Sequence, residues 1–454
     1  MPPLPDDLIA SITKSVNDAF PSQLEYTQKL IRFGGQRGQE SDVQDFVAQQ
    51  FADRGYHTLT FPMDEEALGK HVGAGKISDL HSRAPCVVAT HKPKQQAEGG
   101  RSLILNGHID VVPLGPVDMW ADDPYSAKIK DDKLYGRGAG DMRSGHAANL
   151  WALDALRRIG LQPASEVIIQ SVPEEESTGN GTLMTHLKGY KADAVLIPEP
   201  VQEQLVRANV GVLWFQVEVR GRPVHVRAMS TGVNAIDACW KLVGPLRELE
   251  QEWNERHVSA RFFEKEKHPL SEFCGFCVLS IYVSVFANAV ATIDLNVAIV
   301  NAGDWQSSVP AWCKIQCRIA IVPGVSAASA ASEIEAKIAS FSQQDPYLSE
   351  HPPTITWNGF YSEGYVLEPG SSAEEVLQKA HRHASGGKEL TYQTSTAYLD
   401  ARVHSLYDGI PALVYGPISG DIHGFDEWVS IESVKRVTVA IALFIAEWCG
   451  TEKI

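Results

Sequence analysis

The sequence predicts an α/β fold: a mainly parallel-sheet domain that is discontinuous along the chain, with a smaller α+β domain inserted into it. Three observations lead to this expectation. A chain of 454 residues is longer than one ordinary core accommodates. Strand-like and helix-like segments alternate over residues 1–210, which is typical of a parallel sheet with crossover helices. The texture changes over residues 211–360 and the alternation returns over residues 361–454, so we expect domain boundaries at these positions.

In the first part of the chain, four short apolar runs predict strands, and each is followed by side chains that bind metals or move protons. The runs and the segments after them are 102–105 before 106–110, 133–135 before 136–141, 166–172 before 173–176, and 194–197 before 198–200. Ligands of open α/β sheets bind outside the carboxyl ends of the strands. We therefore expect the four segments to converge on one place.

The other elements follow from periodicity and from helix end signals. Residues 142–159 predict a helix that ends at Gly160. In the inserted domain, we expect strands over 213–220, 279–286, 292–300 and 314–322, and helices over 234–256 and 327–341. After residue 360, we expect a helix over 372–384, a strand over 412–415 and a C-terminal helix from Ile431.

The composition limits the classes of partner and compartment. The formal net charge is −16, so the surface field repels nucleic acid and anionic lipid. We see neither a secretory signal nor an apolar run of about 18 residues that would span a membrane. Seven cysteines, an odd number, favour reduced thiols and a cytoplasmic location. Cys274 and Cys277 have CxxC spacing without a second pair, so we interpret them as buried structural thiols.

The residues after the predicted strands are of the types that hold two divalent cations. Such a site needs a bridging carboxylate, further carboxylates and imidazoles. His108 supplies an imidazole, and Asp110 is placed to accept its second ring N–H. Asp141 follows a glycine-rich turn where the backbone can approach a ligand closely, which suits the bridging role.

Three consecutive acids, residues 174–176, repel one another strongly unless cations lie nearby. One of them can ligate a metal while its neighbour acts as a general base, and the pattern leaves open which does which. Glu199 and His423 complete the set of ligands. Nitrogen and oxygen ligands without thiolate favour zinc, with cobalt or manganese as substitutes.

These motifs resemble the M20 metallopeptidase family, which includes acetylornithine deacetylase, succinyl-diaminopimelate desuccinylase, aminoacylase-1 and glutamate carboxypeptidase. The matching blocks are 105–113, 135–142, 173–176 with Gly179 and Gly181, Glu199-Pro200, and His423 with Asp426-Glu427. Their order spans almost the whole chain. The resemblance assigns the general base to Glu175 and treats Glu174 as a variable acid. It assigns the metal ligands to His108, Asp141, Glu176, Glu199 and His423.

The resemblance also implies that the inserted domain is a lid that mediates dimerisation. His225 matches a histidine that reaches across to steady the oxyanion. Arg402 matches an arginine that grips the substrate carboxylate, although Leu399 stands where the family has threonine. The segment Ser307-Ser308-Val309-Pro310 lacks an asparagine that assists substrate binding in many members.

We therefore predict hydrolysis of the amide bond of an N-acyl amino acid. Glu175 takes a proton from a metal-bridging water and passes it to the leaving amine. Two alternatives stay open: a dipeptidase or carboxypeptidase on the same metals, and a non-catalytic family member that binds metals. We expect small-molecule or short-peptide substrates, a homodimer, and neither nucleic acid nor membrane as a partner.

Overall fold

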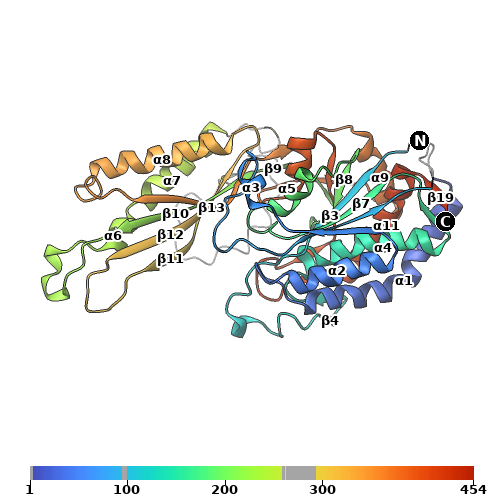
Figure 1. Ribbon diagram of the computed structural model, residues 1–454, viewed down its shortest axis with the longest axis horizontal. Helices are drawn as coiled ribbons and strands as arrows, with labels where there is room; N and C mark the ends of the chain where they lie inside the picture. The colour runs from blue at the N-terminus through green and yellow to red at the C-terminus, as the bar shows by residue number, and fades with distance from the viewer. Residues whose placement is uncertain (1–3, 95–99, 258–260, 262–292) are drawn as a thin grey trace.

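The computed structural model describes residues 4–94, 100–257, 261 and 293–454. Its elements gather around two main sheets that lie end to end along the long axis of the molecule (Figure 1). We call the elements around the six-stranded sheet the larger unit and those around the four-stranded sheet of residues 211–362 the smaller unit. Each unit has its own cluster of buried apolar side chains. The strand expected over 279–286 and the pair Cys274 and Cys277 lie outside the described residues.

The sheet of the larger unit contains the predicted parallel strands. Its order is β1 (His57–Phe61), β2 (Cys86–His91), β7 (Val167–Val172), β3 (Leu103–His108), β8 (Val195–Ile197) and β16 (Ala412–Val414). Strands β7, β3, β8 and β16 run parallel, while β1 and β2 are antiparallel additions at one edge. The four parallel strands are buried along their whole length, which explains why their sequences read as apolar runs without alternation.

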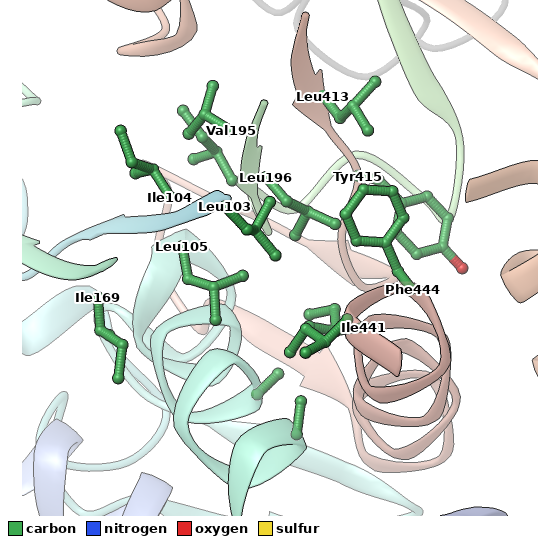
Figure 2. Close-up of a cluster of buried hydrophobic side chains, with 14 of the residues drawn as sticks. Leu103, Ile104, Leu105, Ile169, Val195, Leu196, Leu413, Tyr415, Ile441 and Phe444 are labelled. Atoms are coloured by element: carbon green, nitrogen blue, oxygen red, sulfur yellow. The ribbon is translucent and has the colours of Figure 1, made fainter. Parts of the chain in front are cut away.

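Helices cover this sheet. The long ones are α1 (Asp6–Arg32), α2 (Ser41–Asp53), α4 (Ser144–Arg158), α9 (Ser372–Ala384) and α11 (Ile431–Cys449); α3 (Glu65–Gly69), α5 (Asn180–Leu187) and α10 (Ala401–Val403) are short. Figure 2 shows Leu105, Leu196 and Phe444 in the core where the sheet meets α11. The helices expected over 372–384 and from Ile431 are confirmed. The helix expected over 142–159 begins at Ser144, because residues 139–143 form an irregular turn.

The smaller unit is an antiparallel sheet with helices packed against it. Its strands, in order, are β11 (Leu295–Ala302), β12 (Trp312–Ile321), β10 (Gly211–Arg220) and β13 (Thr354–Ser362), and its helices are α6 (Ala235–Trp240), α7 (Val243–Arg256) and α8 (Ala327–Gln344). Burial alternates along β10, as expected for a sheet with one covered face. The single helix expected over 234–256 is wrong. The ring of Pro245 would clash with the carbonyl four residues earlier, so the chain breaks between α6 and α7.

One of the four strands expected to deliver a site residue lies outside the main sheet. Strand β5 (Lys133–Tyr135) pairs with β4 (Lys128–Lys130) and β18 (Trp428–Ser430), and β17 (Ser419–Gly420) completes this small sheet. The expectation of four strand ends in one sheet is therefore wrong for 133–135, a segment that is only partly buried, unlike the parallel strands of the main sheet. Its pairing with β18 brings the turn that carries Asp141 beside the loop that carries His423.

Two further small sheets complete the described fold. Strand β9 (Leu205–Asn209) pairs with β14 (Tyr365–Val366) and β15 (Tyr392–Ser395), and β6 (Leu161–Pro163) pairs with β19 (Thr451–Lys453).

Over the described ranges, every helix is too short or too polar to cross a bilayer. The described cysteines are free and buried; they are Cys86, Cys239, Cys313, Cys317 and Cys449.

Candidate metal centre

The predicted metal ligands come together at the carboxyl ends of the parallel strands. His108 is the last residue of β3, Glu176 follows β7, and Glu199 follows β8. Asp141 lies on the turn before α4, and His423 lies on the loop between β17 and β18. Five separate segments of the larger unit thus deliver one ligand each.

The ligand atoms form two groups that share Asp141. In the first group, Nε2 of His108 lies 3.0 Å from Oδ1 of Asp141 and 3.7 Å from Oε2 of Glu199. In the second group, Nε2 of His423 lies 3.3 Å from Oδ2 of Asp141 and 3.2 Å from Oε2 of Glu176. Because its two oxygens face different groups, the carboxylate of Asp141 is placed to bridge two ions.

The separations and the donor set fit divalent cations. Four ligands at about 2.0–2.1 Å from a tetrahedral ion lie about 3.3 Å from one another. The donors are imidazole nitrogens and carboxylate oxygens, which zinc, cobalt and manganese accept. Within the described structure, Oε1 of Glu199 is buried and has no hydrogen-bond partner. A buried carboxylate oxygen without a donor is costly, and a cation satisfies it.

The pKa shifts of the ligands have one physical cause, an excess of carboxylate in a buried place. Burial raises the pKa of Glu199 to about 8. Burial works to lower the pKa of His108, but Glu199 and other carboxylates hold it well above its ordinary value. The charge of Glu176 is the largest cause of the raised pKa of His423. Two divalent cations at this place would balance the negative charge.

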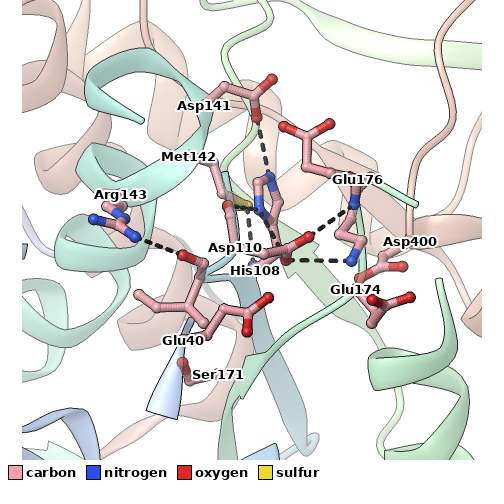
Figure 3. A network of polar contacts seen from close by, with 12 residues as sticks. Glu40, His108, Asp110, Asp141, Met142, Arg143, Ser171, Glu174, Glu176 and Asp400 are labelled. Atoms are coloured by element: carbon pink, nitrogen blue, oxygen red, sulfur yellow. Dashed lines mark hydrogen bonds and ion pairs between the residues drawn. The ribbon is translucent and has the colours of Figure 1, made fainter. Parts of the chain in front are cut away.

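Asp110 supports the centre in a different way from the one expected. The second ring N–H of His108 does not go to the Asp110 carboxylate, whose Oδ1 is 3.6 Å from Nδ1, but to the Asp110 backbone carbonyl at 3.0 Å. A carbonyl only accepts hydrogen bonds, so Nδ1 carries the proton and Nε2 is left to bind a metal. The Asp110 carboxylate instead accepts the backbone N–H of Glu175 at 3.3 Å. It also accepts the backbone N–H of Glu176 at 3.1 Å (Figure 3).

A second buried carboxylate, Glu427, fixes the turn that carries Asp141. One of its oxygens accepts the N–H groups of Gly140 and Asp141 at 2.9 and 3.1 Å. The other accepts the N–H of Gly138 at 3.1 Å and the guanidinium of Arg137 at 2.7 Å. The loop that carries the predicted ligand His423 therefore also positions Asp141.

The three consecutive acids divide between two sides of their turn. Glu175 and Glu176 face the centre, where their carboxylate oxygens lie within 4.8 Å of a ring nitrogen of His108. Glu174 is paired with Arg37 and belongs to none of the candidate metal groups of the described residues. This division favours the register that makes Glu176 a ligand and Glu175 the base.

Glu175 has the environment of a proton carrier. It is buried next to both ligand groups, and burial raises its pKa well above the ordinary value of a glutamate. The charges of Glu199 and Asp400 shift it in the same direction. A carboxyl group with a raised pKa can take a proton from water and hold it until a leaving group needs it.

His225 is not brought to the ligand groups. It is exposed and lies at the start of a short helical turn in the smaller unit. Its Nδ1 accepts the N–H of Arg227 at 3.1 Å, and its backbone pairs with Ser308. The segment that lacks the family asparagine thus lies beside His225, and the predicted oxyanion role stays a prediction.

Arg402 is not brought to the ligand groups either. The residue is fully buried, and its guanidinium donates to the hydroxyls of Tyr398 and Tyr407 at 3.2 and 3.3 Å and to the carbonyl of Gly73 at 2.5 Å. These hydrogen bonds occupy guanidinium N–H groups that would otherwise bind a substrate carboxylate. The predicted carboxylate clamp stays a prediction, and the observed contacts are those of a residue that fixes its neighbours.

Sequence reasoning missed a buried carboxyl group near Glu175. Asp400 accepts the hydroxyls of Thr182 at 2.6 Å and Tyr398 at 3.1 Å, and burial raises its pKa to about 6. Tyr398 also stacks on Phe360 with ring centroids 4.3 Å apart. Asp400 lies in the block that suggested Arg402, so the signal was present although we gave the residue no role.

Comparison with known proteins adds independent evidence. The model of peptidase family M20/M25/M40 matches residues 104–447. N-formyl-4-amino-5-aminomethyl-2-methylpyrimidine deformylase from Halalkalibacterium halodurans is 28% identical over 407 residues, which cover 86% of this chain and 88% of that protein. Acetylornithine deacetylase from Klebsiella pneumoniae is 25% identical over 389 residues, which cover 84% of this chain and 88% of that protein.

A solved structure shows the same fold. Human carnosine dipeptidase 1 matches with a TM-score of 0.72 at 14% sequence identity, over 97% of this chain and 99% of that chain. At this level of identity the likeness concerns the fold alone. The α/β class and the central sheet expected from the sequence are thereby confirmed.

Proposed function

Because the chain belongs to peptidase family M20/M25/M40 and is a hydrolase of amide bonds, we propose that it cleaves a small N-acyl amino acid, with Glu175 as general base. The observation that carries the proposal is the place of Glu175, buried beside two ligand groups that share Asp141. The relative named acetylornithine deacetylase supports an N-acyl amino acid as the substrate class.

The described side chains fit two divalent ions, zinc before cobalt or manganese. His108, Asp141 and Glu199 would hold one ion, and Asp141, Glu176 and His423 would hold the other. When bound, the ions supply Lewis acidity, which polarises the amide carbonyl and makes water a better nucleophile.

The protein's own groups then orient the reactants and carry protons. Glu175 accepts the proton that water loses and later donates it to the nitrogen of the leaving amine, because its raised pKa lets the carboxyl hold a proton between the two steps. Asp110 keeps Glu175 in place through the backbone N–H. His225 would donate to the carbonyl oxygen, once movement of the smaller unit or a second chain places it there.

The test is the variant Glu175→Gln, which keeps the size of the side chain and removes the base. We expect kcat to fall by about 10²–10⁴-fold, with an unchanged metal content by elemental analysis. Near-normal turnover by this variant would sink the assignment of the base.

The substrate class is tested with the wild-type protein on N-acetyl amino acids, N-formyl amines and dipeptides, before and after chelation. Turnover of the acyl amino acids that chelation removes is the expected result. Turnover of dipeptides alone would assign the chain to the peptidase alternative. Bound metal without turnover of any amide would favour the non-catalytic alternative.

We also propose that the chain forms a homodimer through strand β11. Among the described strands, β11 lies at the edge of its sheet and pairs only with β12. Ile299 and Val300 on this strand are each 48% exposed. An exposed edge with apolar side chains is a template for pairing with a second strand, and a second copy of β11 satisfies both features.

A further inference from the structure

We infer that Glu174, through an ion pair with Arg37, is a positioning residue that directs Glu175 and Glu176 into the metal centre. The inference rests on the proposed function, because it takes Glu176 as a ligand and Glu175 as the base. It gives a role to the acid that the sequence pattern left without one.

The Glu174 carboxylate is fully buried and uses both oxygens. Oε1 accepts Nε–H of Arg37 at 2.5 Å and the backbone N–H of Ser82 at 2.8 Å. Oε2 accepts Nη2–H of Arg37 and the hydroxyl of Thr178, both at 2.8 Å. A bidentate, charge-assisted pair with two further hydrogen bonds fixes the orientation of a carboxylate more firmly than a single contact does.

The backbone at Glu174 shows why the turn needs such an anchor. Its φ is +70°, in the left-handed region that residues with a side chain rarely adopt. Backbone of this kind persists only where the surroundings hold it. The Glu174 carbonyl accepts the N–H groups of Thr178 at 3.0 Å and Gly179 at 2.7 Å, which closes the turn that carries Glu175 and Glu176.

Two carboxylates therefore hold this turn through separate contacts. Asp110 accepts the backbone N–H groups of Glu175 and Glu176. Glu174 ties the turn to Arg37 and to Ser82, which lie on two other segments of the chain. Because Arg37 neutralises Glu174, that acid is held away from the centre and the next two acids are left to face it.

The chain offers a matched control for a buried arginine–glutamate pair. Arg207 and Glu374 form two hydrogen bonds at 3.0 and 2.6 Å, and their side chains are only 7% and 4% exposed. This pair joins β9 to α9 and includes no predicted ligand among its described contacts. A loss of stability that follows from breaking any buried ion pair will appear in both pairs.

The decisive experiment is titration of the metal-free protein with Co²⁺, followed by visible absorption. In Glu174→Gln we expect the ion held by Asp141, Glu176 and His423 to bind about 10–100-fold more weakly. In the same variant, we expect the ion held by His108, Asp141 and Glu199 to keep its affinity. In the control variant Glu374→Gln, we expect both ions to keep their affinities. The inference is overturned if both Co²⁺ affinities are unchanged in Glu174→Gln, or if Glu374→Gln loses as much affinity as Glu174→Gln does.

Two further variants separate the side chain from the backbone and from the charge. Glu174→Gly removes the left-handed strain together with the carboxylate, so wild-type cobalt binding by this variant would also overturn the inference.

The double variant Arg37→Met with Glu174→Gln tests whether the two residues act as one unit. If they do, its loss of cobalt affinity is no larger than that of the more affected single variant. Additive losses would contradict this. The cobalt readout needs no substrate, so a failure of the proposed amide hydrolysis is seen separately in the amide panel.

Discussion

The two sides of the proposed active site are built in opposite ways. In the larger unit, Asp141 and the turn with Glu176 are held by the buried carboxylates of Glu427 and Asp110. In the smaller unit, His225 is exposed and its ring accepts one hydrogen bond from a neighbour two residues away. On one side the turns are held by buried carboxylates from distant segments, whereas the described hydrogen bond of the His225 ring comes from within its own turn.

This difference separates metal binding from turnover. The predicted ligands all belong to the larger unit, so we expect metal affinity not to depend on where the smaller unit lies. Stabilisation of the oxyanion should depend on it, because His225 must travel or come from a second chain before it meets a substrate. Variants on the two sides are therefore expected to fail in different ways.

The largest effect is expected for Asp141→Asn in the larger unit. The bridging carboxylate serves both ligand groups, and an amide offers one weaker oxygen, so we expect both ions to be lost together. Elemental analysis should find neither ion, and activity should fall to the level of the chelated protein. Asp237→Asn, an exposed acid on α6, serves as the control. Retention of one tightly bound ion would show that the two groups do not share this residue.

Most of the metal-ligating side could be predicted from the sequence, because its residues follow buried strands. The apolar runs before His108, Glu176 and Glu199 are strands of one sheet, and the topology brings their ends together. Asp141 reaches the same place from a different small sheet, which periodicity over three residues could not show. At Asp141 the sequence pattern therefore predicted a place beside the other candidate ligands, but from a strand that belongs to another sheet.

The supporting contacts could not be predicted, because they join segments far apart in the chain. Nothing in the run of three acids says that Arg37 takes the first of them. The block around Arg402 suggested a clamp, yet the guanidinium is occupied by Tyr398 and Gly73. A motif gives the residue type at a position, whereas the direction of the side chain depends on partners that only the fold brings near.

A smaller effect is expected for His225→Ala in the smaller unit. Loss of one donor to an oxyanion lowers kcat by about 10²–10³-fold, and we expect KM and the metal content to stay close to those of the wild type. Steady-state kinetics with elemental analysis makes the measurement. His351→Ala, at another exposed histidine of the smaller unit, should leave kcat unchanged. A fall in metal content in His225→Ala would remove the distinction between the two sides.

The smallest effect on folding is expected for Ile299→Lys on the edge strand β11. The side chain is 48% exposed, so the free energy of unfolding should change by less than about 0.5 kcal/mol. A lysine on an edge strand opposes pairing with a second copy, so sedimentation should report a single chain where the wild type gives a dimer. Ile129→Lys is the matched control, because Ile129 is 45% exposed on β4 of the larger unit. A dimer that survives Ile299→Lys would show that the interface lies elsewhere.

The kcat of the single-chain Ile299→Lys protein then decides how His225 acts. A kcat equal to that of the wild type means that His225 reaches the substrate by movement within one chain. A loss equal to that of His225→Ala means that the second chain supplies His225.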